Sequence, residues 1–252
     1  MPDLAWNIAT WDGHHATWDG HHDWKTGGEE WSERWGGSEA QWFGSLYSRL
    51  HRFLPTKSIL EIAPGFGRWT KFLIPNSSRY IGVDLSQQCV DACRRTFFNV
   101  GHAAFIKNDG LFLVGIQNNS CDLVFSFDSL PHADLEILQS YIYEIIRVLS
   151  SDGVAFIHHS NLLAFNGSIG QPHARSLTVS ADNVAGAVEL AGGSVLLQEV
   201  INWVGDHMHD CLTLFGRHRA NSKPVRIENP RFMDEAFIIR DFQAVWSKLY
   251  GE

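Results

Sequence analysis

The sequence predicts an α/β fold built on a doubly wound parallel β-sheet. Short apolar segments typical of buried strands alternate with longer segments of helical periodicity. The connections between them are short, which favours parallel strands in one sheet with helices on both faces. A glycine turn at residues 64–67 follows the first of these strands. Because ligands of such sheets bind beyond the carboxyl ends of the strands, this turn is the first candidate site.

The composition limits the function classes. The chain has 252 residues, of which 44% are hydrophobic, enough for the core of one large domain with additions. Its net charge of −8 disfavours a nucleic-acid partner held by phosphate neutralisation. No apolar segment approaches the length of a membrane span, and the N-terminus shows no secretory signal pattern. The four cysteines form no CxxC pair, so we expect reduced thiols and a cytoplasmic protein.

Residues 1–37 are expected to form an irregular arm and lid rich in tryptophan and histidine. Residues 9–15 are repeated at once as residues 16–22, a unit too short to be a folding repeat. Its histidines could bind a metal, or the repeat could be a flexible arm. Seven of the ten tryptophans lie within the first 42 residues. Trp31 and Trp35 are the best candidates for a lid over a ligand.

The predicted helices have apolar residues at helical spacing, and most carry start or stop signals. The first begins at a capping box formed by Ser38 and Gln41 and ends before Pro55. Ser86 caps the third helix, and Gly192 follows the end of the fifth. The expected helices cover residues 39–54, 68–73, 87–98, 134–149, 180–191 and 233–250.

The predicted strands are short apolar runs bounded by turns. A polar insertion at 160–179 follows the fifth of them. The chain therefore divides into the arm at 1–37, a domain at 38–219 and a helical extension at 220–252, which could pack on the domain or on a second copy in a homodimer. The expected strands cover residues 58–63, 80–84, 103–107, 121–128, 154–159, 194–203 and 211–216.

The glycine turn suits a nucleotide, and its surroundings restrict which one. Asp84 ends the second strand 19 positions after Gly65, as in sites where an acid binds the ribose. A dinucleotide site expects a further glycine near position 70, where Trp69 and Thr70 stand instead. Glu61, in the strand before the turn, suits a cationic ligand.

With these residues in place, the chain resembles the class I S-adenosylmethionine-dependent methyltransferases. Residues 61–67 resemble the glycine motif that holds the methionine moiety, with Pro64 where a small residue is common. Residues 82–84 resemble the strand end whose acid binds the ribose, and residues 108–110 the segment whose acid reaches the adenine amino group. Residues 121–127 and 147–153 resemble the fourth strand and the turn before the fifth.

The resemblance covers residues 58–160 and implies a seven-stranded, mostly parallel sheet with an antiparallel last strand. It also implies S-adenosylmethionine as the cofactor. The cofactor-binding residues that it implies are Glu61, Pro64, Gly65, Gly67, Asp84, Leu85, Asn108, Asp109, Gly110 and Phe127.

A narrower resemblance concerns the acceptor. Residues 23–32, 35–42, 125–132 and 156–161 are similar to a bacterial branch of sugar and polysaccharide O-methyltransferases, which includes enzymes acting on methylmannose polysaccharide precursors. This implies a sugar or oligosaccharide acceptor, a mannoside being one candidate. Two alternatives stay open: a methyltransferase of a non-sugar small molecule, and a non-catalytic S-adenosylmethionine-binding partner of a glycosyltransferase.

A sugar hydroxyl is protonated at neutral pH, so its methylation needs a base, and histidine has a suitable pKa. His132, in the loop after the fourth strand, is the favoured base, although it could only shape the pocket. His158 and His159 alternate along a strand, so at most one of them faces the pocket. The candidate catalytic residues are therefore His132, His159 and Asp128, and the candidate substrate-binding residues are Trp31, Trp35, His158, His173 and Arg175.

Asp128 has two candidate roles. It could orient a histidine or bind a divalent metal such as magnesium, which some sugar O-methyltransferases use to bind vicinal hydroxyls. Magnesium prefers oxygen ligands, and Asp128, His132 and His159 do not form an all-oxygen set. The sequence thus leaves a metal open without indicating one.

Overall fold

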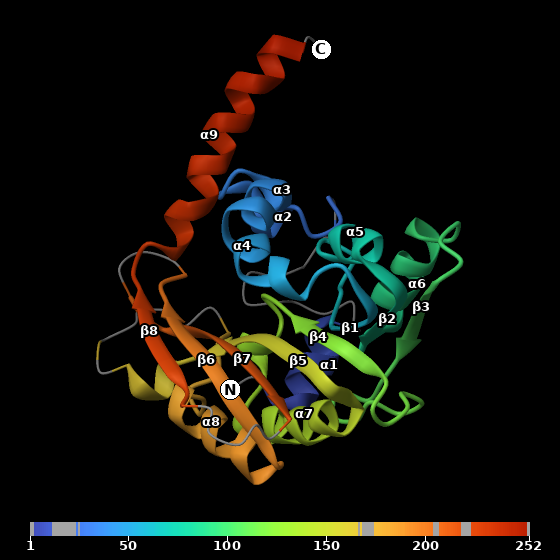
Figure 1. Cartoon of the computed structure of the whole chain (residues 1–252), viewed down its shortest axis with the longest axis vertical. Helices are drawn as coiled ribbons and strands as arrows, with labels where there is room; N and C mark the ends of the chain where they lie inside the picture. Colours follow the sequence, from blue (N-terminus) through green and yellow to red (C-terminus); the bar gives the residue numbers. More distant parts are fainter. Residues whose placement is uncertain are drawn as a thin grey trace.

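The protein is described by a computed structural model over residues 3–11, 24, 26–165, 167, 174–203, 207–217 and 223–250. One mixed sheet runs through the centre of this part of the chain, in the order β3-β2-β1-β4-β5-β7-β6-β8, with helices on both faces (Figure 1). The strands are β1 Thr56–Ile62, β2 Ser77–Asp84, β3 Ala103–Lys107, β4 Cys121–Ser126, β5 Leu149–Ser160, β6 Gly193–Ile201, β7 Asp210–Arg217 and β8 Val225–Asn229.

Strand directions confirm a doubly wound, mostly parallel sheet. Parallel pairing joins β3, β2, β1, β4 and β5 in that order, whereas β7 runs antiparallel to both β5 and β6. The expectation of seven strands is wrong, because β8 pairs in parallel with the outer edge of β6. Four of the five β8 residues are exposed. Val225 and Ile227 alternate with polar residues, but both are exposed, so pairing with β6 and not burial defines this strand.

The helices follow the predicted order, with differences at the N-terminal end. Their bounds are α1 Leu4–Trp11, α2 Glu30–Glu33, α3 Gly37–Gln41, α4 Tyr47–Leu50, α5 Thr70–Leu73, α6 Gln87–Thr96, α7 Leu135–Val148, α8 Ala181–Leu190 and α9 Phe232–Tyr250. A π-helical turn at Trp42–Leu46 joins α3 to α4, and single 3₁₀ turns occur at His51–Phe53, Ile74–Asn76, Leu130–His132 and Leu162–Ala164. The helical run at 37–53 thus replaces the uninterrupted helix expected at 39–54.

The predicted capping box at Ser38 is wrong. The N-cap residue of α3 is Gly36, in the left-handed conformation. Ser38 instead donates its backbone N–H and its hydroxyl to the Glu29 carboxylate, at 3.0 and 2.5 Å. Glu29 lies nine positions before Ser38, so a capping motif within the first helical turn does not reveal this contact. The Ser86 cap of α6 is confirmed, since its hydroxyl accepts a hydrogen bond from the Cys89 N–H.

Side-chain alternation along the strands divides the core into two layers. On β1, Leu60 and Ile62 belong to a cluster with α7 and α8, whereas Ile59 belongs to a cluster with the 37–53 helical run and α9. α1 joins the first layer through Leu4. In the second layer the backbone of α9 approaches Gly44 so closely that a Cβ there would lie 2.6 Å from the Glu235 carbonyl oxygen. The rest of α9 projects beyond the body of the protein (Figure 1).

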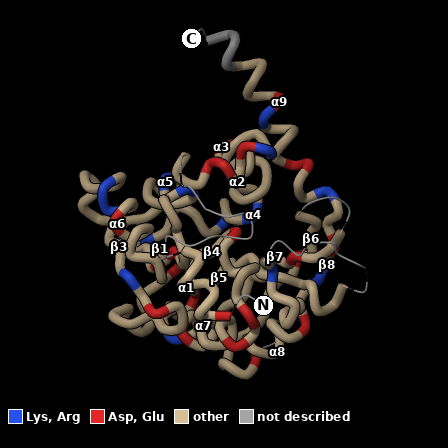
Figure 2. The backbone as a smooth tube through the Cα atoms, turned by 180° about the vertical axis from the view of Figure 1, so that it is seen from behind, with Lys and Arg blue, Asp and Glu red and all other residues tan. Residues whose placement is uncertain are grey.

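The arm is partly helical and not irregular as expected, because residues 4–11 form α1. Most of the duplicated segment, residues 12–22, lies outside the described residues. Within the described part no helix is long and apolar enough to cross a membrane, and no group of three or more His, Cys, Asp or Glu side chains could hold a metal ion. All four cysteines are buried free thiols. Figure 2 shows acidic and basic residues interspersed along the backbone.

Candidate active site

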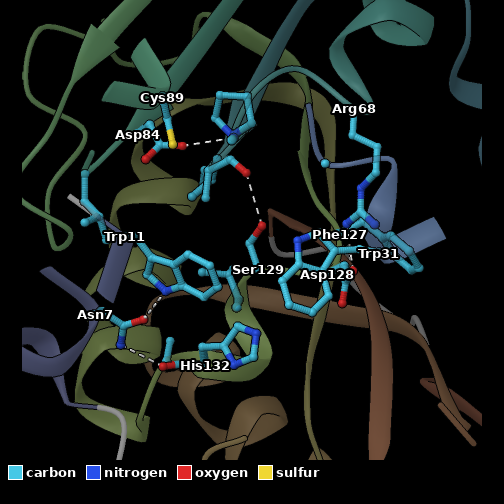
Figure 3. Close-up of a pocket in the computed structure, with 18 of the residues that line it drawn as sticks. Asn7, Trp11, Trp31, Arg68, Asp84, Cys89, Phe127, Asp128, Ser129 and His132 are labelled. Carbon is cyan, nitrogen blue, oxygen red and sulfur yellow. Dashed lines mark hydrogen bonds and ion pairs between the residues drawn. The ribbon is translucent and has the colours of Figure 1, made fainter. Parts of the chain in front are cut away.

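A cavity of about 330 Å³ opens at the carboxyl ends of β1, β2 and β4. β1 pairs with β2 on one side and with β4 on the other, so the connections that leave these strand ends diverge and leave a crevice. Its walls include the glycine turn, Asp84 and the segment 127–130 that follows β4. Figure 3 shows these side chains pointing into a common space.

The glycine turn depends on backbone conformations that favour glycine. Gly65 and Gly67 have φ angles of 59° and 95°. A Cβ at Gly67 would lie 2.7 Å from the Phe97 ring, and one at Gly65 would lie 3.1 Å from the Trp24 ring. The Cys93 thiol donates a hydrogen bond to the Gly65 carbonyl oxygen at 3.2 Å. The turn is therefore held firmly, and its main chain stays close to the cavity.

Asp84 lies beside this turn, as the sequence predicts. Its Oδ2 accepts a hydrogen bond from the Gly65 N–H at 3.0 Å, and its Oδ1 accepts one from the Ser86 N–H at 2.8 Å. The side chain is buried and lines the cavity. These two backbone donors fix the carboxylate at the cavity wall, where it can meet the hydroxyls of a ribose.

Glu61 does not line the cavity, contrary to the expectation of a ligand contact. It is 1% exposed, and its Oε2 accepts hydrogen bonds from the Tyr80 hydroxyl and, at 2.8 Å, from Thr70 Oγ1. Burial raises the pKa of Glu61 to about 7, and the charge of Asp84 adds to the rise, against the hydrogen bonds from Tyr80 and Thr70. Glu61 is thus a partner of core hydroxyl groups beneath the turn.

The third predicted strand end contributes in part. Gly110 and Leu85 line the cavity, and Asn108 donates a hydrogen bond from its Nδ2 to the Tyr141 hydroxyl at 2.9 Å. Asp109 lies outside the cavity lining. Its exposed carboxylate instead accepts hydrogen bonds from the backbone N–H groups of the next turn, at 2.9 and 2.8 Å.

The N-terminal segment covers the cavity, which the sequence did not reveal beyond the general expectation of a lid. Asn7 of α1 donates a hydrogen bond from its Nδ2 to the His132 carbonyl oxygen at 2.8 Å. The Trp11 ring lies 5.6 Å from the His132 ring and 6.3 Å from Trp24. Trp24 stacks on Phe66 of the glycine turn, with 4.5 Å between ring centroids. Figure 3 shows Trp11 between the Asp84 end and His132.

His132 lines the cavity on the 3₁₀ turn that follows β4, as expected for the candidate base. Its Nδ1 lies 3.0 Å from the Ala174 carbonyl oxygen, so Nδ1 carries a proton and the lone pair of the neutral ring is on Nε2. Burial lowers the pKa of His132, and the charge of Arg175 acts in the same direction. The ring is therefore neutral at pH 7 and able to accept a proton.

Asp128 also lines the cavity, and an arginine neutralises it. Arg68 Nη2 lies 2.7 Å from its Oδ2, and the guanidinium stacks over the Trp69 ring at 4.7 Å. Asp128 has a φ of 62°, a left-handed conformation that is rare for a residue other than glycine. Figure 3 shows Arg68 and Asp128 beside Phe127 and Trp31.

His158 and His159 both lie outside the cavity lining, so the structure does not bring the candidate catalytic residue His159 to the site. His159 is 0% exposed, with Nε2 2.7 Å from Thr213 Oγ1 and Nδ1 2.8 Å from the Ser160 carbonyl oxygen. Burial lowers its pKa to about 4. His158 is equally buried and bonds to Asp128 and Asp210. Strand alternation did not decide which of the two histidines faces the cavity; in the structure both rings bind residues of β7 instead.

Among the other candidate substrate contacts, Trp31, Trp35 and Arg175 line the cavity. Trp35 also packs in the core, with its ring 5.7 Å from Phe237. His173 lies outside the described residues. Several lining residues were not predicted as site residues from the sequence: Leu4, Asn7, Trp11, Trp24, Tyr141 and Trp203.

Comparisons with known proteins concern the domain and the fold that carry this cavity. Residues 59–153 match a family model described as a methyltransferase domain. The fold is similar to an S-adenosylmethionine-dependent methyltransferase from Clostridium acetobutylicum, with a TM-score of 0.57, 14% identity and coverage of 71% of this chain and 92% of that chain. It is also similar to the CcbJ methyltransferase from Streptomyces caelestis, with a TM-score of 0.56, 13% identity and coverage of 72% and 94%.

A further similar structure is an S-adenosylmethionine-dependent methyltransferase from Mesorhizobium loti, with a TM-score of 0.51, 14% identity and coverage of 70% and 97%. No curated protein matches the sequence significantly. At these identities the solved structures establish only the fold, and the family model matches residues 59–153 to a methyltransferase domain. Together they support a class I S-adenosylmethionine-dependent methyltransferase fold with S-adenosylmethionine as its cofactor.

Proposed function

We propose that the protein is an S-adenosylmethionine-dependent O-methyltransferase that acts on a hydroxyl of a sugar or oligosaccharide, with His132 as the general base. The observation that carries this proposal is the single cavity that joins the Asp84 end of the sheet to His132. In this proposal the cofactor binds at the glycine turn and Asp84, and the neutral ring of His132 lines the same cavity, so that a base lies in the space that holds the methyl donor.

The residues present fit the cofactor. The left-handed glycines keep side chains away from the turn, and the fixed Asp84 carboxylate can accept hydrogen bonds from ribose hydroxyls. Leu85 and Gly110 lie at the end where the resemblance places the adenine. When bound, S-adenosylmethionine supplies an activated methyl group for in-line transfer. The chain's own task is then to hold the acceptor in line and to take its proton.

His132 performs the second task in this proposal. The Ala174 carbonyl fixes the proton on Nδ1, so the acceptor hydroxyl gives its proton to Nε2. The lowered pKa keeps the ring neutral before the reaction and makes the resulting imidazolium release its proton readily to solvent. Trp11 and Asn7 of α1 pack against this histidine and its backbone.

The aromatic walls support a ring-shaped acceptor. Trp31, Trp35 and Trp203 line the cavity, and flat aromatic rings stack on the apolar faces of sugars. The same walls also suit a phenolic or other apolar small molecule, which is the second candidate acceptor class. Methylation assays with panels of monosaccharides, oligosaccharides and phenols, read by mass spectrometry, decide between the two.

The test of the base compares His132→Gln with His159→Gln. Both variants remove a buried imidazole, but only the first removes one from the cavity. We expect His132→Gln to bind S-adenosylmethionine like the wild type and to lose about 10²- to 10⁴-fold in kcat. We expect His159→Gln to retain turnover. If His132→Gln keeps full turnover of an acceptor found in the panel, the base lies elsewhere. If no acceptor is methylated while the cofactor binds, a non-catalytic binding module becomes the better reading.

A further inference from the structure

Asp210, the first residue of β7, lies at the centre of a buried polar network. It is 0% exposed. Arg175 Nε lies 2.8 Å from its Oδ1, Arg175 Nη2 lies 2.8 Å from its Oδ2, and His158 Nε2 lies 3.1 Å from the same Oδ2. Burial alone would raise the pKa of Asp210, but the charge of Arg175 and the hydrogen bond from His158 hold it below its usual range. Asp210 is therefore an ionised anchor for two different segments.

The first segment carries the hydrogen bond that orients His132. Arg175 follows Ala174, whose carbonyl oxygen accepts the hydrogen bond from His132 Nδ1. Ser176 donates its backbone N–H to the Pro131 carbonyl oxygen at 2.9 Å, next to His132. Ala174 has a φ of 54°, a left-handed conformation that needs support from its neighbours. The Asp210–Arg175 ion pair supplies that support, because it fixes the residue directly after Ala174.

The second segment carries Asp128. His158 Nδ1 accepts a hydrogen bond from the Asp128 N–H at 3.2 Å, so the neutral His158 ring carries its proton on Nε2 and donates it to Asp210. Asp128 has a left-handed backbone and pairs with Arg68. One carboxylate at the start of β7 is thus linked to both His132 and Asp128 through their neighbours, although Asp210 itself does not line the cavity.

We propose that Asp210 is a positioning residue for the methyl transfer, which fixes the Nδ1-protonated tautomer of His132 through Arg175 and Ala174 and holds Asp128 through His158. This rests on the function proposed above. The proposal gives a role to His158 of β5 and Asp210 of β7, which both lie outside the cavity lining. His158 acts on Asp128 directly, and Asp210 acts on His132 through Arg175 and Ala174.

The charges around His132 give the direction of the pH effect. Arg175 lowers its pKa, whereas Asp128 and Asp210 raise it. α1, which packs over the ring with Trp6, Asn7 and Trp11, contains no charged residue between Leu4 and Trp11. Removal of the Asp210 charge leaves Arg175 uncompensated, so the acid limb of the kcat–pH profile should move to lower pH.

The experiment compares Asp210→Asn with Glu199→Gln in the full chain. Glu199 is a matched control, because it is also buried and ion-paired with an arginine, Arg49, at 2.5 Å, and it lies away from the cavity lining. The nitrogen chemical shifts of ¹⁵N-labelled histidine report the His132 tautomer without any acceptor. We expect Asp210→Asn to populate the Nε2-protonated form, to lower kcat about 10- to 100-fold, and to keep cofactor affinity within about twofold. Glu199→Gln should change neither the tautomer nor the acid limb.

Arg175→Lys keeps the proposal testable if Asp210→Asn does not fold. It retains the charge but loses the paired guanidinium contacts, so the tautomer should shift while the acid limb stays in place. A folded Asp210→Asn or Arg175→Lys protein with the wild-type His132 tautomer overturns the proposal. Because the tautomer is read without turnover, a fully active His132→Gln variant would refute the proposed base and leave this result standing.

Discussion

The substitution Glu61→Gln tests whether Glu61 is a buried partner of core hydroxyl groups, as the structure shows, or a contact of the bound ligand, as the sequence suggests. The folded protein holds Glu61 with a pKa of about 7, whereas its ordinary value is 4.5. Between these pH values the folded state keeps a proton that the unfolded state has lost, so the stability of the wild type falls as pH rises. The difference between 4.5 and about 7 corresponds to about 3 kcal/mol. A glutamine oxygen can still accept hydrogen bonds from Tyr80 and Thr70, so the variant lacks only the titration.

The assay is urea unfolding of both proteins between pH 4.5 and 8, followed by tryptophan fluorescence, with cofactor affinity measured at pH 7.5. The free energy of unfolding of the wild type minus that of Glu61→Gln should fall by about 3 kcal/mol across this range, because all other titrations cancel. Affinity for S-adenosylmethionine should stay within about twofold, since Glu61 does not line the cavity. A difference that does not vary with pH refutes the burial argument, and a tenfold loss of affinity restores the ligand contact.

Two further variants test the packing of the same region. For His159→Gln the pH effect has the opposite sign, because the folded pKa of His159, about 4, lies below its ordinary value of 6.5. The stability of the wild type relative to this variant should therefore rise by about 3 kcal/mol from pH 4 to 6.5. A stability difference that does not change with pH would contradict the burial of His159. Gly67→Ala should lower the free energy of unfolding by about 1–3 kcal/mol, because the φ of Gly67 is 95° and the new Cβ would lie 2.7 Å from the Phe97 ring. In the control Gly101→Ala the new Cβ has no atom within 4 Å, so stability should change by less than about 0.5 kcal/mol. Equal effects of the two substitutions would show that the glycine turn is not strained.

The centre of the sheet follows from the sequence because its strands are buried on both faces. Ile59 and Leu60 face opposite layers, and both are fully covered, which is what an unbroken apolar run indicates. β8 gives no such signal, since pairing with β6 and not burial makes it a strand. α1 is short, and its position depends on the bond from Asn7 to the His132 carbonyl, 125 positions away.

The candidate site divides in the same way. The cavity positions of Gly65 and Asp84 were predictable, because a turn and the strand end beside it are local features whose meeting follows from parallel pairing. Gly67 was also predicted as a cofactor contact, but it shapes the turn without lining the cavity. The positions of His158 and His159 outside the cavity were not predictable. Asp210 and Thr213 of β7 bind these two rings across an antiparallel strand pair, and sequence periodicity does not show that pairing.

The most direct measurement of the central claim is titration calorimetry of S-adenosylmethionine into the wild type, Asp84→Ala and Asp109→Ala. The buried Asp84 carboxylate lines the cavity beside the glycine turn, whereas the exposed Asp109 carboxylate caps a turn outside it. The account predicts that the wild type binds, that Asp84→Ala binds at least about tenfold more weakly, and that Asp109→Ala binds within about threefold of the wild type. No binding by the wild type, or unchanged affinity in Asp84→Ala, would contradict it.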